Sequence, residues 1–165
     1  MVFKKACVFG LAVITLTAFA QGTFVEGARG LGRARSADGK IGYFRFEVAR
    51  LTNGTESGIR GSWSFTNAAT NPSERFEINL VRLAVLGVQG NVAELGGRAV
   101  LVKMGPNGAI RKEGYLMSRV EDRKQPKVAG DPDKYKFRFV GDNGGPLIEF
   151  DGLVTDGDLI VIDNH

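Results

Sequence analysis

The chain contains one cysteine, one histidine and one tryptophan in 165 residues, and the scarcity of the first two excludes whole classes of site. The histidine is His165, the last residue, so neither a Ser-His-Asp triad nor a histidine-based zinc site is expected. The cysteine is Cys7, which lies in the predicted leader and would be removed with it, so no thiolate site is expected. The sequence also has no Gly-x-Ser-x-Gly elbow and no phosphate-binding loop. We therefore expect a protein that is not an enzyme and has no cofactor and no metal.

The first 20 residues have the pattern of a secretory signal peptide. Lys4 and Lys5 form a short basic region, and an apolar run over residues 6–17 leads to small residues at the cleavage site. This run is shorter than the roughly 20 residues that a membrane-spanning helix needs. We expect a helical leader (1–20), export to the periplasm or the extracellular space, and one domain (21–165) with no membrane attachment. That domain would have no disulfide, so its core alone must hold it together.

Charge is nearly balanced once the leader is set aside. The whole chain has 22 basic and 18 acidic side chains and a net charge of +4. Removal of Lys4 and Lys5 leaves 20 basic side chains against 18 acidic ones. Nucleic-acid binding requires a concentrated positive face, so no nucleic-acid partner is expected. The remaining length of about 145 residues is suited to a single domain.

Alternating apolar residues organise the processed chain. Phe44, Phe46 and Val48 occupy alternate positions, with Arg45 and Glu47 between them. Because successive side chains of a strand point to opposite faces, this pattern predicts one buried face and one solvated face. The same two-residue period recurs in further segments, at 29–35, 59–65, 93–101, 115–120, 135–139, 148–154 and 159–162.

Turn residues separate these segments at short intervals. Asp38-Gly39 is typical of a two-residue hairpin turn, in which both central residues have positive φ. Longer polar loops are expected at 66–73 and 121–134, and a further turn at Asp156-Gly157. Strands at this spacing predict an all-β antiparallel meander of about eight to ten strands that closes into a barrel. A two-sheet β-sandwich is the alternative, because the longer loops could carry the chain between sheets.

Two places along the chain predict a local irregularity. Between residues 76 and 85 the apolar side chains change from even to odd positions, which indicates a β-bulge or a passage between faces. Small residues around Gly97 indicate a crowded place, where another backbone or a large ring lies close. Trp63 or the pair Phe44 and Phe46 is expected to fill that space.

Turn and strand signals recur across most of residues 30–162. They are Gly30-x-Gly32, Gly42-x-Phe44-x-Phe46-x-Val48, Asn53-Gly54, Gly90-Asn91-Val92-Ala93 with Gly97, Tyr135-x-Phe137, and Asp142-Asn143-Gly144 with Asp151. In this combination the chain resembles a group of uncharacterised secreted bacterial β-domains, found alone or appended to larger extracellular proteins. The resemblance implies a secreted β-domain and brings no known activity or catalytic residue. The charged segment around 121–134 departs from the pattern.

One kind of enzyme is still an alternative, a glycoside hydrolase, because its reaction needs only two carboxylates. Glu47, Glu77, Glu94 and Glu149 lie on expected strands, at or beside solvated positions. A catalytic pair such as Glu94 and Glu149 would have to face each other across a cleft, about 5–10 Å apart. Acidic turns such as 131–133 lack the ligand spacing of a calcium-binding loop, and turns select aspartate for backbone reasons alone.

Three functions remain, in order of preference. The first is a secreted non-catalytic domain that binds a ligand or has a structural role in the cell envelope or extracellular space. A carbohydrate or another surface ligand is its candidate partner, and Trp63, Tyr43 and Tyr115 are the candidate binding residues. For Trp63 a buried core ring is the favoured interpretation and an exposed sugar-stacking ring the alternative. The second function is a small-ligand carrier that uses the barrel interior, and the third a carbohydrate-active enzyme with paired carboxylates.

Overall fold

The computed structural model describes residues 22–105, 108–123 and 131–164. The predicted leader and the middle of the predicted 121–134 loop lie outside these residues. Within them the chain is all-β, with two short 3-10 turns, η1 (Pro72–Glu74) and η2 (Asp142–Gly144). The eight strands are β1 (Thr23–Ser36), β2 (Ile41–Asn53), β3 (Glu56–Asn67), β4 (Phe76–Gln89), β5 (Val92–Gly105), β6 (Gly108–Glu121), β7 (Lys134–Gly141) and β8 (Leu147–Asp163).

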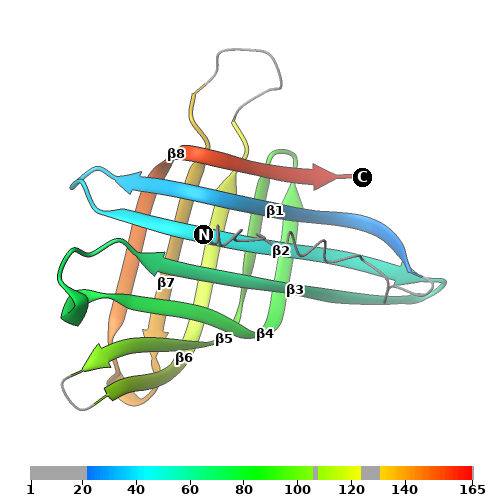
Figure 1. The fold of residues 1–165 in the computed structure, drawn as a ribbon. Helices are drawn as coiled ribbons and strands as arrows, with labels where there is room; N and C mark the ends of the chain where they lie inside the picture. The colour runs from blue at the N-terminus through cyan, green and yellow to red at the C-terminus, as the bar shows by residue number, and fades with distance from the viewer. Residues whose placement is uncertain (1–21, 106–107, 124–130, 165) are drawn as a thin grey trace, which may run out of the picture.

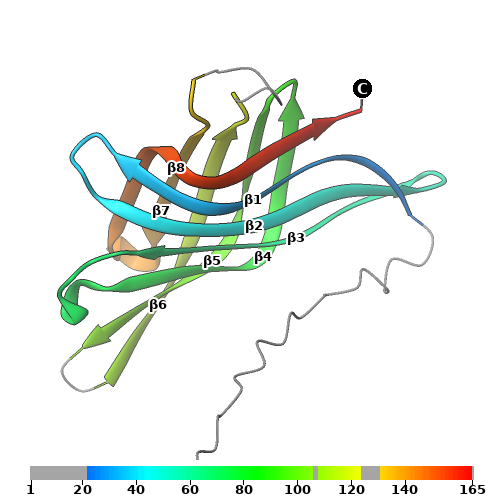
Figure 2. The same ribbon diagram turned by 45° about the horizontal axis from the view of Figure 1, so that its top comes forward.

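Each strand pairs antiparallel with the next, and β8 pairs with β1 to close the ring (Figure 1). The predicted antiparallel meander is therefore confirmed. The two faces of the ring run across each other, with β1, β2 and β3 on one face and β5, β6 and β7 on the other (Figures 1 and 2). They are continuous rather than two separate sheets, because β8 pairs with β7 through its first half and with β1 through its second.

Strand β8 differs from the sequence-based prediction of two strands separated by a turn. Asp156-Gly157 is not a turn: the strand continues through it and bends, and the β1–β8 register shifts opposite this place. Gly157 has a φ of +94°, and a Cβ there would collide with the carbonyl oxygen of Leu31. A glycine was correctly recognised as special here, but it serves a bend inside a strand.

The β1–β2 turn is where the sequence places it but has another geometry. Gly39 alone has a positive φ, +85°, whereas the predicted two-residue turn requires positive φ at Asp38 as well. The Ser36 N–H donates to the Lys40 carbonyl at 2.9 Å, and the Gly39 N–H donates to the Ser36 carbonyl at 3.0 Å. The loop is thus longer, with a single glycine in the left-handed region.

Aromatic rings fill the interior of the ring of strands. Phe44, Phe46 and Val48 are each 2% exposed, so the predicted buried face of β2 is confirmed. Further buried rings enter from β3, β7 and β8, namely Trp63, Phe65, Tyr135, Phe137, Phe139 and Phe150. Tyr135 stacks on Phe44 with 4.5 Å between ring centroids. The core is therefore one cluster of packed rings that joins opposite walls of the barrel.

The predicted irregularity in β4 is confirmed. The β4–β5 register shifts twice, between Leu80 and Arg82 and between Leu83 and Val85. The crowding at Gly97 comes from this bulged strand. A Cβ on Gly97 would collide with the carbonyl oxygen of Arg82 and lie 3.0 Å from the Ala84 nitrogen. The prediction of a close backbone is correct at Gly97, and the prediction that an aromatic ring fills the space is wrong there.

Candidate functional site

Trp63 is not a surface residue. Its side chain is 2% exposed, and its ring meets Phe137 edge-on with 5.3 Å between centroids. The ring is also stacked with Tyr135 and Phe65, at 6.3 and 6.5 Å. The favoured interpretation of a core ring is correct, and a sugar-stacking role for Trp63 is wrong, because no face of the ring is open to solvent.

Tyr43 and Tyr115 are both at the surface, 52% and 59% exposed. They lie on β2 and β6, which are opposite each other in the ring of eight strands, so they cannot belong to one site. The Arg98 guanidinium lies over the Tyr115 ring, 4.7 Å from its centroid. Arg98 also donates to both carboxylate oxygens of Asp142, at 2.9 and 2.8 Å, which lowers the pKa of Asp142.

The carboxylates named as a possible catalytic pair are far apart. Glu94 on β5 and Glu149 on β8 both point outward, and two further strands lie between them. Three inter-strand spacings of about 4.8 Å separate them by about 14 Å, beyond the range of about 5–10 Å that glycoside hydrolysis uses. Each also forms an ion pair, Glu94 with Arg119 at 2.7 Å and Glu149 with Arg138 at 3.3 Å. The predicted arrangement across a cleft is wrong.

The packed interior also argues against a small-ligand carrier, because rings occupy the space that a ligand would need. Two polar atoms lie within this core, the Trp63 Nε1 and the Tyr135 hydroxyl, and neither makes a hydrogen bond with good geometry among the described residues. Burial raises the pKa of Tyr135 well above its usual range, and weaker interactions with Ser118 and Trp63 oppose that rise. The folded protein therefore keeps this phenol neutral at a pH where the unfolded chain ionises it.

This difference predicts how stability changes at alkaline pH. The phenol ionises near pH 10 in the unfolded chain, so folding stability should fall above that pH by about 1.4 kcal/mol per pH unit from this group. Tyr135→Phe should remove that loss while changing stability little at pH 7, since the hydroxyl makes no good hydrogen bond. Urea unfolding at pH 7, 10 and 11, followed by Trp63 fluorescence, measures both proteins. Parallel pH profiles for the two would contradict the assignment.

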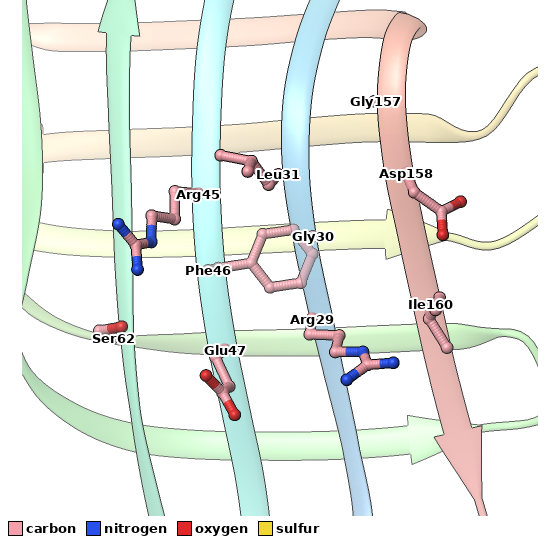
Figure 3. A pocket seen from close by; sticks show the side chains of 10 residues that line it. All are labelled: Arg29, Gly30, Leu31, Arg45, Phe46, Glu47, Ser62, Gly157, Asp158 and Ile160. Atoms are coloured by element: carbon pink, nitrogen blue, oxygen red, sulfur yellow. The ribbon is translucent and has the colours of Figure 1, made fainter. Parts of the chain in front are cut away.

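An open groove of about 660 Å³ crosses the outer face of β8, β1, β2 and β3 (Figure 3). Strand pairing places its side chains in two cross-strand rows, Arg45–Leu31–Asp158 and Glu47–Arg29–Ile160. Gly30 lies between the rows, and the Phe46 ring lies beneath it. The sequence could not reveal this groove, because most of its side chains are outward-facing residues of four strands that pairing alone brings together.

The charged side chains of the groove have no ion-pair partner among the residues that the structure describes: Arg29, Arg45, Glu47 and Asp158. Arg29 and Glu47 are cross-strand neighbours, yet they do not meet. In Figure 3 the guanidinium of Arg29 points toward β8, and that of Arg45 toward β3. Positively charged hydrogen-bond donors, the two guanidiniums, and negatively charged acceptors, the two carboxylates, are thus available to a ligand.

The part of the barrel formed by β5, β6, β7 and the first half of β8 has a different charge arrangement. Of the ten ion pairs among the described residues, eight lie on β5–β8 and the segments that connect them. There the carboxylates pair with arginine and lysine side chains. The groove concentrates uncompensated charge beside apolar surface, since Leu31 is 66% exposed and Tyr43 lies on the same face of β2, two residues before Arg45.

No group of three acidic, histidine or cysteine side chains in residues 22–105, 108–123 and 131–164 is arranged to hold a metal ion. Asp133, one of the predicted acidic-turn residues, is buried and accepts a hydrogen bond from the Arg123 N–H at 2.9 Å, so it anchors the chain next to β7. The same ranges contain no helix long and apolar enough to cross a membrane.

No protein-family model, no curated protein and no solved structure matches this chain. The resemblance to secreted bacterial β-domains stays a prediction.

Proposed function

We propose that the protein is an exported, non-catalytic binding module and that the groove on β8, β1, β2 and β3 is its ligand site. The observation that supports this most directly is the set of four charged groove side chains without ion-pair partners. Charged side chains on adjacent strands of a surface commonly pair, as they do on β5–β8 here. Side chains that stay separate beside exposed Leu31 and Tyr43 can instead bind a ligand without first breaking an internal ion pair.

The groove suits a polar ligand with apolar faces, and a carbohydrate has that chemistry. Guanidiniums donate hydrogen bonds and carboxylates accept them. The rows around Arg29 and Glu47 can therefore bind a sugar hydroxyl either as an acceptor or as a donor. The exposed face of Tyr43 and the side chain of Leu31 offer apolar surface to a sugar ring. The groove is open rather than enclosed, which suits a chain-like ligand that extends past it.

The test is binding to a panel of neutral and acidic polysaccharides, with affinities measured by isothermal titration calorimetry. We expect the double variant Arg29→Gln/Arg45→Gln to lower affinity for the bound polysaccharide by at least about tenfold, since each hydrogen bond to a charged group contributes roughly 1.5–3 kcal/mol net of its exchange with water. Arg111→Gln is the matched control, because it removes an exposed arginine from β6 and should leave affinity unchanged.

Two results would contradict this assignment. One is the absence of binding to every polysaccharide of the panel. The other is binding that the double variant leaves intact, which would place the site elsewhere on the surface. Circular dichroism of each variant verifies that the fold is unchanged.

A further inference from the structure

The ring of strands is incompletely paired at one seam. β3 and β4 pair only through Ser64–Thr66 and Glu77–Asn79. Beyond these three residue pairs the two strands diverge, and β3 continues alongside β2 alone (Figure 1). Among the described residues, the edge of β3 from 56 to 63 that faces away from β2 has no backbone partner.

This free edge belongs to an arm that extends beyond the rest of the barrel. The β2–β3 hairpin, with β1 beside β2, projects past the place where β4 turns away, and both ribbon views show its tip clear of β4 (Figures 1 and 2). Residues 56–58 and 60–62 are exposed. A second strand could therefore approach the edge without displacing any described element.

An exposed edge presents unpaired N–H and C=O groups, which are a template for another strand. Proteins usually protect such an edge with proline, an inward-pointing charge, a bulge or a covering loop. The stretch from 56 to 62 contains no proline, and its side chains are mostly small: Ser57, Gly58, Gly61 and Ser62. Small side chains on both faces of the sheet leave room for the side chains of a partner strand that pairs with this edge.

The charge order along this edge is complementary to itself. In an antiparallel pairing of two copies about a two-fold axis at Gly58, Glu56 of each copy lies opposite Arg60 of the other. Opposite charges that face each other directly across two strands are stabilising, whereas like charges are destabilising. Shifting the axis by half a residue or by one residue removes both charge pairs, so the charges specify a single register.

We propose that this edge of β3 is a self-association surface, through which two copies pair antiparallel with Glu56 opposite Arg60. Glu56 has no ion-pair partner among the described residues, so it is available to a second copy. Arg60 already takes part in an interaction within the chain. The pairing does not require Arg60 to be free, because a guanidinium has five N–H donors. The dimer is weak, since two short paired strands bury less than the roughly 1,200 Å² of a standard interface.

Charge exchange tests this register. Sedimentation velocity over a concentration series should show the unchanged protein in a monomer–dimer equilibrium. Arg60→Glu alone and Glu56→Arg alone should each lower the association constant by at least about tenfold, because each places two like-charged pairs at the interface. The double variant Glu56→Arg/Arg60→Glu restores both pairs in reverse and should associate as the unchanged protein does.

A mixture of the two single variants is the most selective measurement. One variant then carries only acidic side chains at the two positions and the other only basic ones, so the mixed pair is complementary while each variant alone is not. We expect dimers to reappear on mixing. Arg111→Glu on β6 is the control and should not affect association.

Four results would overturn the proposal. They are a protein that stays monomeric at every concentration, single variants that associate unchanged, and a mixture that fails to recover dimers. The fourth is capture of a different extended peptide by the same edge without self-association. None of these results bears on the groove, whose variants carry no change at Glu56 or Arg60.

Discussion

Replacement of Phe65 by alanine is expected to destabilise the protein by about 3–5 kcal/mol, the range for removal of a large buried ring from a core. Phe65 is 1% exposed, and its ring has five aromatic neighbours. The nearest are Phe137 at 4.6 Å and Phe150 at 5.0 Å between centroids. Because these neighbours come from β7 and β8, on the far wall of the barrel, removal of the ring leaves a cavity that no single strand can close.

Chemical denaturation measures this cost. Trp63 is the only tryptophan, so its fluorescence reports on the core, and circular dichroism at the same denaturant concentrations reports on the sheet. A loss of this size is a large part of the roughly 5–15 kcal/mol that stabilises a domain. Phe65→Leu should fold more readily and lose less, since it retains most of the apolar volume.

Leu147→Ala is the surface comparison, because Leu147 is 53% exposed on β8 and its loss should change stability by less than about 0.5 kcal/mol. If Phe65→Ala unfolded at nearly the same urea concentration as the unchanged protein, the interior could not be the tightly packed cluster of rings described above.

The core could be predicted from the sequence because its residues follow one pattern, the alternation of apolar and polar side chains along a strand. Phe44, Phe46 and Val48 alternate with charges, and a strand must place such a set on one face. Tyr135 and Phe137 follow the same rule and enter the same interior. Turn residues then placed the strand ends, since glycine and aspartate mark a turn whichever strands they connect.

The sequence predicts where strands lie better than whether one strand continues through a turn-like segment. Asp156-Gly157 has the composition of a turn, but β8 passes through it because β1 and β7 offer partners to its two halves. Local composition does not reveal the partner at Asp156-Gly157, which is β1, more than 100 positions earlier in the chain. The same limit applies to the short β3–β4 seam, which depends on how far the whole ring curves.

The candidate site could not be predicted from the sequence. Trp63 is chemically suited to bind a sugar, but its place in the alternation sends it to the interior. Tyr43 lies beside the groove, and Tyr115 lies on the opposite side of the barrel. The decisive property of Arg29 and Glu47 is that their side chains point apart, and a side-chain direction of this kind depends on neighbouring strands rather than on residue type.

At Gly97 the sequence predicts crowding, and the structure identifies the backbone that causes it. β4 bulges twice opposite this residue, and its backbone occupies the space where a side chain would begin. The colliding group, the Arg82 carbonyl, is part of the sheet and cannot rotate away as a side chain could. Addition of a single methyl group therefore forces the two strands apart at the bulge.

Gly97→Ala is accordingly expected to destabilise the protein by about 1–3 kcal/mol or more, the range for overpacking a well-packed interior. Gly87→Ala on β4 is the matched control, since a Cβ there meets no atom within 4 Å and the backbone needs no positive φ. That control should be neutral or stabilising by up to about 1 kcal/mol, because alanine has less conformational freedom to lose on folding. Urea midpoints of the two variants are compared with the unchanged protein. Equal midpoints for both would mean that β4 can move away from Gly97, and that the bulge does not hold the strand in place.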